Sequence, residues 1–321
     1  MYPLKLKPTL KDYIWGGTKL ITDFSKKTNF NKVAESWELA CHKDGSSVIS
    51  NGPLEGISFK DYIEKFGLEV MGKNCQRFSE FPILIKLIDA KDNLSIQVHP
   101  QDEYAMRTAN QFGKTEMWYI LDCEPDAFII FGFNSTITTK EFDMHIKCDT
   151  LLDVLNKVYV KKGDVFFIKS GTVHAIGKGI LIAEIQQNSN LTYRVYDYNR
   201  LGADNKPRET HVKQALEVAN LSKPCASDFT HVKKIVNDTF AKTLLRKCEY
   251  FTVYDLQINV CATLEVSALS FHSIVVLSGN LMLLSEHGDI SLKKGDSVFL
   301  PASYGEYRLL GQAWAILTTI E

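Results

Sequence analysis

The sequence has no excess of charge of one sign and no long apolar run. Its 321 residues include 37 lysines and arginines against 38 aspartates and glutamates, which gives a formal net charge of −1. Nucleic acid is not an expected partner, because neutralising phosphates requires a clear basic excess. No uncharged apolar run reaches the ~18 residues of a transmembrane helix, and the first residues show no signal-peptide core. We therefore expect neither a nucleic-acid nor a membrane partner.

Paired cysteines are also missing. The seven cysteines are widely scattered and include no Cys-x-x-Cys pair. This pattern fits neither a disulfide framework nor a zinc knuckle, and it is typical of free thiols in a reducing compartment. The expected location is the cytoplasm. Hydrophobic residues make up 45% of the chain, enough apolar mass to exclude disorder as the main state.

Short β-rich runs recur along the first two thirds of the chain. Gly, Asn and Asp turns separate them at intervals of roughly ten residues, a spacing typical of an antiparallel sandwich or barrel. The runs are Phe81–Leu87, Leu94–Val98, Glu116–Leu121, Ala127–Phe131, Val165–Ile168, Leu181–Ile185 and Thr192–Tyr198.

Helical patterns are fewer. Ser58–Phe66 begins with an N-cap serine, and Asp102–Gln111 follows a His-Pro pair. Thr139–Val158 carries apolar residues at helical spacing, and Thr210–Ala219 begins with another good cap. The sequence therefore predicts a mainly β fold with appended helices.

A polar stretch without apolar periodicity, Ser222–Thr239, precedes a nearly all-strand region, Phe240–Glu321, with expected turns at 278–280 and 286–289. At ~100–200 residues per domain, the length allows two domains. We expect a first, catalytic domain over residues 1–235 and a smaller β domain over residues 236–321.

An internal repeat links the two predicted domains. The segment Lys161–Ile168 (KKGDVFFI) recurs as Lys293–Leu300 (KKGDSVFL). The same offset places Ser303 at the position of Gly171 and Glu306 at the position of His174. Although the four-residue turn sequence is common, the matching apolar strand behind it favours a true repeat in which only the first copy keeps the histidine.

Three segments of the first half supply metal-ligand residue types on predicted strands or their ends: Gln97-Val98-His99, Glu116 and His174. Gln97 and His99 are two residues apart and project to the same face of a strand. Alone, each histidine is more often structural and Glu116 more often a solvated charge. Together, two neutral imidazoles, a carboxylate and an amide oxygen suit a divalent ion such as Zn²⁺, one per chain.

The spacing of these residues follows the motifs of the cupin superfamily. Gly163-x5-Lys169-x-Gly171-x2-His174 matches G-x5-P-x-G-x2-H, apart from lysine at the proline position. The first cupin motif, H-x-H with a later glutamate, takes the form Gln97-x-His99 followed by Glu116. We therefore expect a cupin jelly-roll barrel with appended helices, and a second, degenerate cupin-like β domain without ligands.

Six further segments stand in an order that points to one family. They are Tyr13–Gly17, Ala34–Glu38, Phe81–Lys86, Leu94–Pro100, Gly113–Tyr119 and Glu184–Arg194. In these segments the sequence resembles the type I mannose-6-phosphate isomerases (phosphomannose isomerases) in their short bacterial form. The resemblance covers Asp12–Asn220 well and the C-terminal part loosely.

The resemblance implies a zinc-dependent aldose–ketose isomerase that interconverts mannose 6-phosphate and fructose 6-phosphate through a cis-enediol. By this resemblance His99, Glu116 and His174 hold the metal, and Gln97 is the expected fourth ligand.

The resemblance also assigns pocket residues. Arg194 matches the family's active-site arginine. Lys114 and Glu184 are expected to be catalytic, and Ser95 and Lys86 to bind the substrate. The long eukaryotic members carry Asn-His-Lys-Pro-Glu where this chain has only Lys-Thr-Glu, and they insert a helical domain that is absent here. Contacts from that insert cannot be carried over.

The residues themselves leave several roles open. The base is a pocket carboxylate such as Glu184, which we slightly favour, a metal-bound hydroxide, or Lys114 with a lowered pKa. Arg194 stabilises the enediolate or grips the phosphate, or it forms a structural ion pair with Asp197 or Glu184.

Further cations and aromatic residues are open in the same way. Arg200 and Arg208 are phosphate candidates on charge alone, the alternative being solvated surface. Trp15 and Trp37 line the sugar pocket or belong to the core.

Two other classes of function compete with the isomerase. The first is a different enzyme on the same barrel, such as a metal-dependent dioxygenase or another sugar-phosphate isomerase. The second is a non-enzymatic sugar sensor or a structural cupin. Oxygenase sites usually offer Fe²⁺ open facial positions, which the Gln-x-His pattern does not suggest. The expected partner is a small phosphosugar, and the expected assembly a monomer or weak homodimer.

Overall fold

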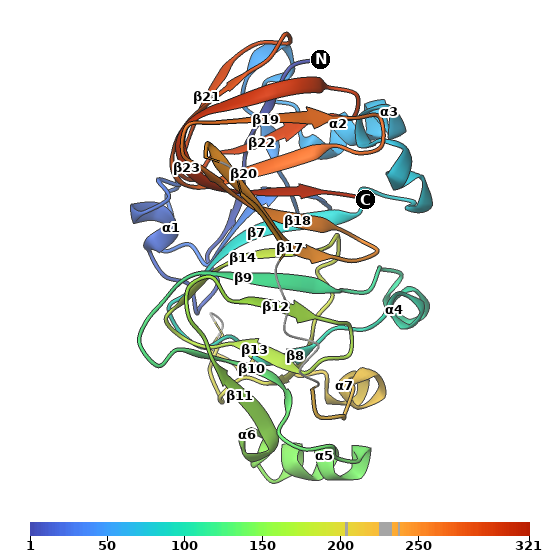
Figure 1. Cartoon of the computed structure of the whole chain (residues 1–321). Helices are drawn as coiled ribbons and strands as arrows, with labels where there is room; N and C mark the ends of the chain where they lie inside the picture. The colour runs from blue at the N-terminus through green and yellow to red at the C-terminus, as the bar shows by residue number, and fades with distance from the viewer. Residues whose placement is uncertain (203–204, 225–232, 237) are drawn as a thin grey trace.

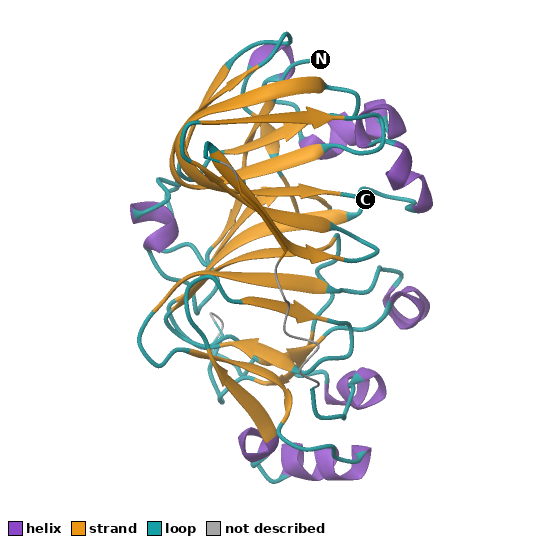
Figure 2. Cartoon of the chain, in the orientation of Figure 1, coloured by secondary structure: helices purple, strands orange, loops and turns teal. Residues whose placement is uncertain are grey.

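The computed structural model describes residues 1–202, 205–224, 233–236 and 238–321. Strands dominate, and the helices lie at the periphery (Figure 2). The helices are α1 (Lys19–Thr22), α2 (Phe59–Phe66), α3 (Leu68–Met71), α4 (Asp102–Ala109), α5 (Thr139–Lys147), α6 (Leu151–Val154) and α7 (Val212–Val218). None of the described helices is long and apolar enough to cross a membrane. The expected mainly β architecture with appended helices is confirmed.

Two antiparallel sheets of the first half face each other. The six-stranded sheet has the order β12 (Val165–Ile168), β9 (Glu116–Cys123), β14 (Ile180–Gln187), β7 (Ile83–Ala90), β3 (Glu35–Leu39), β2 (Thr9–Lys11). The five-stranded sheet has the order β11 (Leu155–Tyr159), β10 (Phe128–Phe133), β13 (His174–Ile176), β8 (Ile96–Val98), β15 (Tyr193–Tyr196). Apolar side chains from both sheets pack in one cluster between them. No ladder joins the described strands of the two sheets, so the jelly roll is a sandwich rather than a closed barrel.

A third, ten-stranded sheet contains the C-terminal strands. Its main path is β16 (Lys233–Val236), β17 (Phe240–Lys247), β18 (Thr252–Ile258), β23 (Gly305–Thr319), β20 (His272–Leu284), β22 (Ser297–Leu300), β1 (Leu4–Lys7), β6 (Val48–Ile49). Beside this path, β19 (Cys261–Val266) pairs with β23 and β21 (Ile290–Lys293) with β20. A small hairpin joins β4 (Cys41–His42) to β5 (Gly45–Ser46). The N-terminal strands β1 and β6 belong to this sheet, and the predicted division between residues 235 and 236 stays a prediction.

The six-stranded sheet is buried on both faces. Packing on both sides holds in place the strands that carry the site residues. Figure 1 shows this sheet between the five-stranded sheet and the C-terminal strands. Along β9, Trp118 and Ile120 face the five-stranded sheet. Met117, Tyr119 and Leu121 alternate with them and pack into the cluster shared with the C-terminal strands. This two-residue alternation lets one strand serve both interfaces.

Two expected elements differ from the structure. The helix expected over 139–158 ends at Lys147, and residues 155–159 instead form β11 along β10. Between them Asp149 has a positive φ of 57°, which breaks the helical path. The turn expected at 278–280 is a bulge inside β20, where the register with β23 shifts between Val276 and Ser278. The helix was predicted too long because helical spacing does not show that residues 155–159 can instead pair with β10.

The other elements agree with the sequence to within a few residues. Ser58 caps α2 by accepting a hydrogen bond from the Asp61 backbone N–H at 3.0 Å. The cap expected at Thr210 is wrong, because α7 begins at Val212 after His211 and has no side-chain cap. The 286–289 turn lies between β20 and β21 as expected. Part of the polar stretch 222–239, residues 225–232 and 237, lies outside the described residues.

The repeat is confirmed in atomic detail. In the first copy the Lys161 N–H donates to Asp164 Oδ2 at 2.9 Å. In the second, the Lys293 N–H donates to Asp296 Oδ2, also at 2.9 Å. Each turn is followed by a four-residue strand, β12 or β22. The same local hydrogen bonding therefore starts the same strand twice.

Candidate active site

Strand pairing brings three predicted site residues side by side in the five-stranded sheet. His174, the first residue of β13, stands opposite Gln97 on β8, and Gln97 stands opposite Arg194 on β15. His99 follows the end of β8 by one residue. Residues far apart in the sequence thus lie side by side on three neighbouring strands.

The opposite sheet presents a polar row across four strands. Trp118 on β9 pairs with Glu184 on β14, which pairs with Lys86 on β7, which pairs with Trp37 on β3. Glu116 lies two residues before Trp118 and therefore projects to the same face. The site is formed where this row faces the histidines.

A compact, buried group of metal-ligand atoms lies between the sheets. One ligand atom each from His99, Glu116 and His174 can be chosen so that all lie within 4.8 Å of one another. His174 Nε2 is 3.3 Å from Glu116 Oε1, and His99 Nε2 is 3.7 Å from Glu116 Oε2. The amide Nε2 of Gln97 lies 3.4 Å from His174 Nε2. The predicted ligand types therefore converge on one place.

The tautomers of the two histidines suit metal binding. His99 Nδ1 lies 3.0 Å from the carbonyl oxygen of Leu191, and His174 Nδ1 lies 2.8 Å from that of Thr172. A carbonyl oxygen only accepts, so each Nδ1 carries the proton and each Nε2 is the unprotonated nitrogen. The Nε2 of His99 lies 3.2 Å from Lys114 Nζ, and the Nε2 of His174 faces the Gln97 amide nitrogen. Burial lowers the pKa of His174 to about 4 and the pKa of His99 well below its usual range. Both rings are therefore neutral near pH 7.

Glu116 is a carboxylate without enough protein partners. Its side chain is fully buried, and neither oxygen receives a hydrogen bond of acceptable geometry within the described residues. Lys114 Nζ does lie 2.7 Å from Oε2, close enough for an ion pair. Burial raises the pKa of Glu116, and repulsion from Glu184 adds to the rise. A cation bound between Glu116 and the two imidazoles would supply the missing partner.

Lys86 and Glu184 form a buried pair in the polar row. Lys86 Nζ is 3.2 Å from Glu184 Oε1 and 3.4 Å from Glu35 Oε2, while the Trp118 indole donates to Glu184 Oε2 at 3.0 Å. Burial alone would raise the pKa of Glu184, but Lys114, Lys86 and the indole outweigh it and lower the pKa to about 2. Glu184 is therefore ionised at all physiological pH values.

A cavity of about 500 Å³ opens onto this chemistry. Ser95, Lys86, Gln97, Lys114, Glu184 and Arg194 all line it. A larger cavity of about 880 Å³ contains none of the predicted site residues. The smaller one is therefore the candidate substrate pocket, with room for a small polar ligand.

Arg194 lines the pocket, and no acidic side chain among the described residues forms an ion pair with it. Its guanidinium donates from one terminal nitrogen to the backbone carbonyl of Glu209 at 2.7 Å, and its buried Nε has no hydrogen-bond partner. The alternative of a structural ion pair with Asp197 is wrong, because Asp197 is bound by Arg200 at 2.6 Å and Arg208 at 2.7 Å. No ion pair joins Arg194 to Glu184 among the described residues. Arg194 is therefore available to an anionic ligand.

The two arginines that were candidates on charge alone have different places. Arg208 lines the pocket and is held by Asp197 through two hydrogen bonds of 2.7 Å. Arg200 does not line it and instead donates to Asp197 and to the carbonyl of Asn93. Trp15 lines the pocket, whereas Trp37 is fully buried.

One buried acid was missed as an individual site residue. Glu35 lines the pocket, accepts a hydrogen bond from the Trp37 indole at 2.7 Å and pairs with Lys86. The signal was present, because Glu35 falls within the Ala34–Glu38 segment that carried the resemblance. The two-residue spacing of Glu35 and Trp37 on a strand places them on one face and was available from the sequence.

Comparisons with known proteins agree on one family. The family model described as phosphomannose isomerase type I, catalytic domain, matches residues 3–125. The model described as mannose-6-phosphate isomerase, cupin domain, matches residues 241–320. Mannose-6-phosphate isomerase ManA of Bacillus subtilis is 40% identical to this chain, covering 98% of each protein. This chain belongs to the type I phosphomannose isomerase family.

Solved structures support the family and the fold. The crystal structure of mannose 6-phosphate isomerase from Bacillus subtilis superposes with a TM-score of 0.92 at 34% identity, over 99% of both chains. A mannose 6-phosphate isomerase bound with zinc and yttrium superposes with a TM-score of 0.77 over the whole of both chains, at 17% identity. At that identity the second likeness shows the shared fold alone. The expected cupin-type β architecture of phosphomannose isomerases is confirmed.

Proposed function

We propose that this protein interconverts mannose 6-phosphate and fructose 6-phosphate as a zinc-dependent aldose–ketose isomerase. The observation that carries the proposal is the buried His99–Glu116–His174 cluster beside a pocket lined by Arg194, which forms no ion pair with an acid among the described residues. Membership of the phosphomannose isomerase family supports the choice of substrate. The proposed ligands are these three residues and Gln97.

A divalent ion held by these residues would act as a Lewis acid, polarising the sugar oxygens at C1 and C2 and stabilising negative charge. The two imidazole nitrogens and one carboxylate oxygen fit zinc, with further positions left for substrate or water. The zinc in a relative of the same fold supports this choice.

The protein's own residues are proposed to bind the phosphate and move the proton. The substrate phosphate is a dianion, so Lys86 and Ser95 are proposed to bind it. Arg194 is proposed to stabilise the developing cis-enediolate, since a guanidinium stays charged in a pocket. Lys86 is already buried and Arg194 half-buried before substrate binds, so holding the two side chains in place costs little free energy on binding.

Glu184 is proposed to transfer the proton between C1 and C2, with Lys114 beside it as a second proton carrier. A carboxylate with a pKa of about 2 is a weak base. The role therefore requires that bound substrate take over part of the positive charge of Lys86 and Lys114. Lys114 Nζ lies 3.9 Å from Glu184 Oε1, so one substrate group bound between them can contact both side chains.

The test is a substrate comparison with the purified protein. We expect fructose 6-phosphate to form from mannose 6-phosphate but not from glucose 6-phosphate, and no ketose from unphosphorylated mannose. Turnover of mannose at a similar rate would contradict the proposed phosphate site. Binding of mannose 6-phosphate without turnover would contradict the isomerase and support the sensor.

We also propose a cytoplasmic location and a monomer or weak homodimer. The six cysteines among the described residues are all free, which suits a reducing compartment. Light scattering over a range of concentrations tests the assembly, and a stable trimer or larger assembly would contradict it.

A further inference from the structure

The three residues Gly113–Thr115, here called the 113–115 segment, lie in the loop between α4 and β9 and directly precede the metal-ligand candidate Glu116. The segment carries Lys114, whose Nζ is 2.7 Å from Glu116 Oε2 and 3.2 Å from His99 Nε2. All three of its residues are buried. The backbone position of this segment therefore determines where the Lys114 ammonium and the Glu116 carboxylate lie.

The segment is held by hydrogen bonds to its backbone. The Gly113 N–H donates to Asp102 Oδ1 at 2.7 Å. The Thr115 N–H donates to Gln187 Oε1 at 2.8 Å, and the Gln187 N–H donates back to the Thr115 carbonyl at 3.0 Å. On its other side, the carbonyl of Lys114 accepts from Ser170 Oγ at 3.1 Å.

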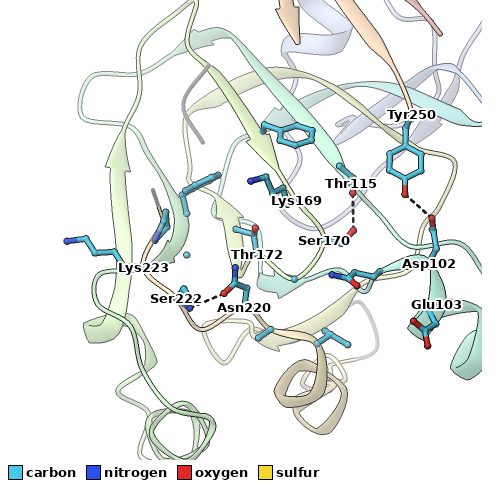
Figure 3. Close-up of a pocket in the computed structure, with 18 residues that line it drawn as sticks. Asp102, Glu103, Thr115, Lys169, Ser170, Thr172, Asn220, Ser222, Lys223 and Tyr250 are labelled. Atoms are coloured by element: carbon cyan, nitrogen blue, oxygen red, sulfur yellow. Dashed lines mark hydrogen bonds between the residues drawn. The ribbon is translucent and has the colours of Figure 1, made fainter. Parts of the chain in front are cut away.

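Asp102 joins these contacts to the C-terminal strands. Besides Gly113, it accepts from Gln187 Nε2 at 3.0 Å and from the Tyr250 hydroxyl at 2.9 Å. Tyr250 lies in the loop between β17 and β18. Figure 3 shows Tyr250 pointing at Asp102, with Thr115 and Ser170 bonded to each other nearby. One carboxylate thus accepts hydrogen bonds from three neutral donors in three separate parts of the chain.

We propose that Asp102 is a positioning residue for Lys114 and Glu116, and that Tyr250 links the C-terminal strands to the active site through it. Removing the carboxylate leaves the buried Gly113 and Gln187 donors without a partner, so the segment must shift to satisfy them. A displacement of about 1 Å at a catalytic group can cost up to 10²-fold in rate. The kinetic part of this inference rests on the proposed function.

The experiment compares Asp102→Ala with Asp102→Asn. We expect Asp102→Ala to lower kcat about tenfold with less than about a threefold change in KM, and to weaken zinc binding about tenfold in a chelator competition. Asp102→Asn should stay within about threefold of the wild type, because its amide oxygen still accepts from Gly113 and Gln187 while its NH₂ donates to the Tyr250 oxygen. Zinc affinity is measured without substrate, so it does not depend on the reaction.

The link to the C-terminal strands is tested with a matched pair of tyrosines. Tyr250→Phe should lower kcat about threefold, and it should have no further effect in the Asp102→Ala background, since both changes break the same contact. Tyr254→Phe is the control, because its hydroxyl binds the Glu321 carboxylate at 2.7 Å away from the 113–115 segment. This control should keep wild-type kcat.

Several outcomes would overturn the inference. Wild-type kcat and zinc affinity in Asp102→Ala, or an equal loss in Asp102→Asn, would contradict the positioning role. An equal loss in Tyr250→Phe and Tyr254→Phe would contradict the link. If Asp102→Ala does not fold, the tyrosine pair decides. If the wild type lacks isomerase activity, the proposed function fails while the zinc affinities still decide the positioning role.

Discussion

The two copies of the Lys-Lys-Gly-Asp turn share one backbone conformation. The β structures that they belong to differ in their interiors, because the first holds buried charged residues and the second is filled by an apolar cluster. Gly163 has a φ of +93° and donates its N–H to the carbonyl of Ile120 at 2.8 Å. Gly295 has a φ of +88° and donates to the carbonyl of Val276, also at 2.8 Å. The equivalent bonds align β9 with β20 residue by residue.

This alignment places different chemistry at equivalent positions. Glu116 pairs with Ile168 as His272 pairs with Leu300, so His272 occupies the position of Glu116, the candidate metal ligand. His272 is bonded to the Tyr307 hydroxyl at 2.9 Å, and burial lowers its pKa to about 4. Glu306, at the position of His174, is exposed.

The interior of the C-terminal copy is filled by an apolar cluster that includes Tyr304 and Tyr307. The first copy instead holds the buried candidate metal ligands and the buried charged residues of the site. Turn bonding and strand alternation therefore keep the shared β architecture, and a few interior positions decide whether metal-ligand residue types converge inside it.

The largest contrast is expected between His174→Ala and Glu306→Ala. His174→Ala should lose zinc and lower turnover by about 10³-fold, because a metal worth several kcal/mol of charge stabilisation is lost. Glu306→Ala should keep zinc and activity, since the exposed Glu306 holds no ligand position. Zinc analysis and kcat measure both. Full zinc retention in His174→Ala would refute the ligand assignment.

Arg194→Ala should keep its zinc but lower kcat about 10²-fold, as for loss of one preorganised charge-stabilising donor. As a control, Arg308→Ala removes an exposed arginine of the C-terminal strands and should leave kcat unchanged. Zinc content and kcat of the two variants are compared. Wild-type turnover in Arg194→Ala would remove this residue from the mechanism.

Replacing the two turn glycines by alanine should destabilise the protein to different extents, although the φ values of the two glycines agree. An alanine Cβ at 163 meets nothing within 4 Å, so only backbone strain of about 1–2 kcal/mol is expected. At 295 the Cβ would lie 2.3 Å from the Phe24 carbonyl oxygen, adding about 1–3 kcal/mol of overpacking. Thermal unfolding should therefore rank Gly295→Ala below Gly163→Ala, and the reverse order would show that packing against Phe24 does not matter.

The smallest effect is expected from Glu306→His. The graft restores one histidine, and His272 stands where the carboxylate would be, but a zinc site needs three or four converging ligands. The variant should still bind one zinc per chain with unchanged kcat. Binding of a second zinc of comparable affinity would show that the copies differ less than their interiors indicate.

Much of the site could be predicted from the sequence because its residues lie at fixed spacings. Gln97, His99 and His174 follow the cupin pattern, and β-strand alternation puts Gln97 and His99 on one face. Glu116 was found by its place in a recognisable segment. The repeat was visible because the turn needs the same glycine and aspartate in both copies.

Contacts that depend on register or on distant pairing could not be predicted. The row of Trp118, Glu184 and Lys86 follows from the pairing of three strands, which no local pattern specifies. Asp102 meets Tyr250 across 148 residues of sequence. Strand β11 was mistaken for helix because its apolar spacing fits both periods, and pairing with β10 decides between them.

Zinc-dependent isomerase activity is tested by measuring fructose 6-phosphate formation from mannose 6-phosphate through one cycle of zinc removal and return, with the zinc content determined at each step. Turnover should disappear as the single zinc leaves and recover when one zinc per chain is restored. Undiminished turnover by the fully zinc-free protein would contradict the proposed zinc dependence.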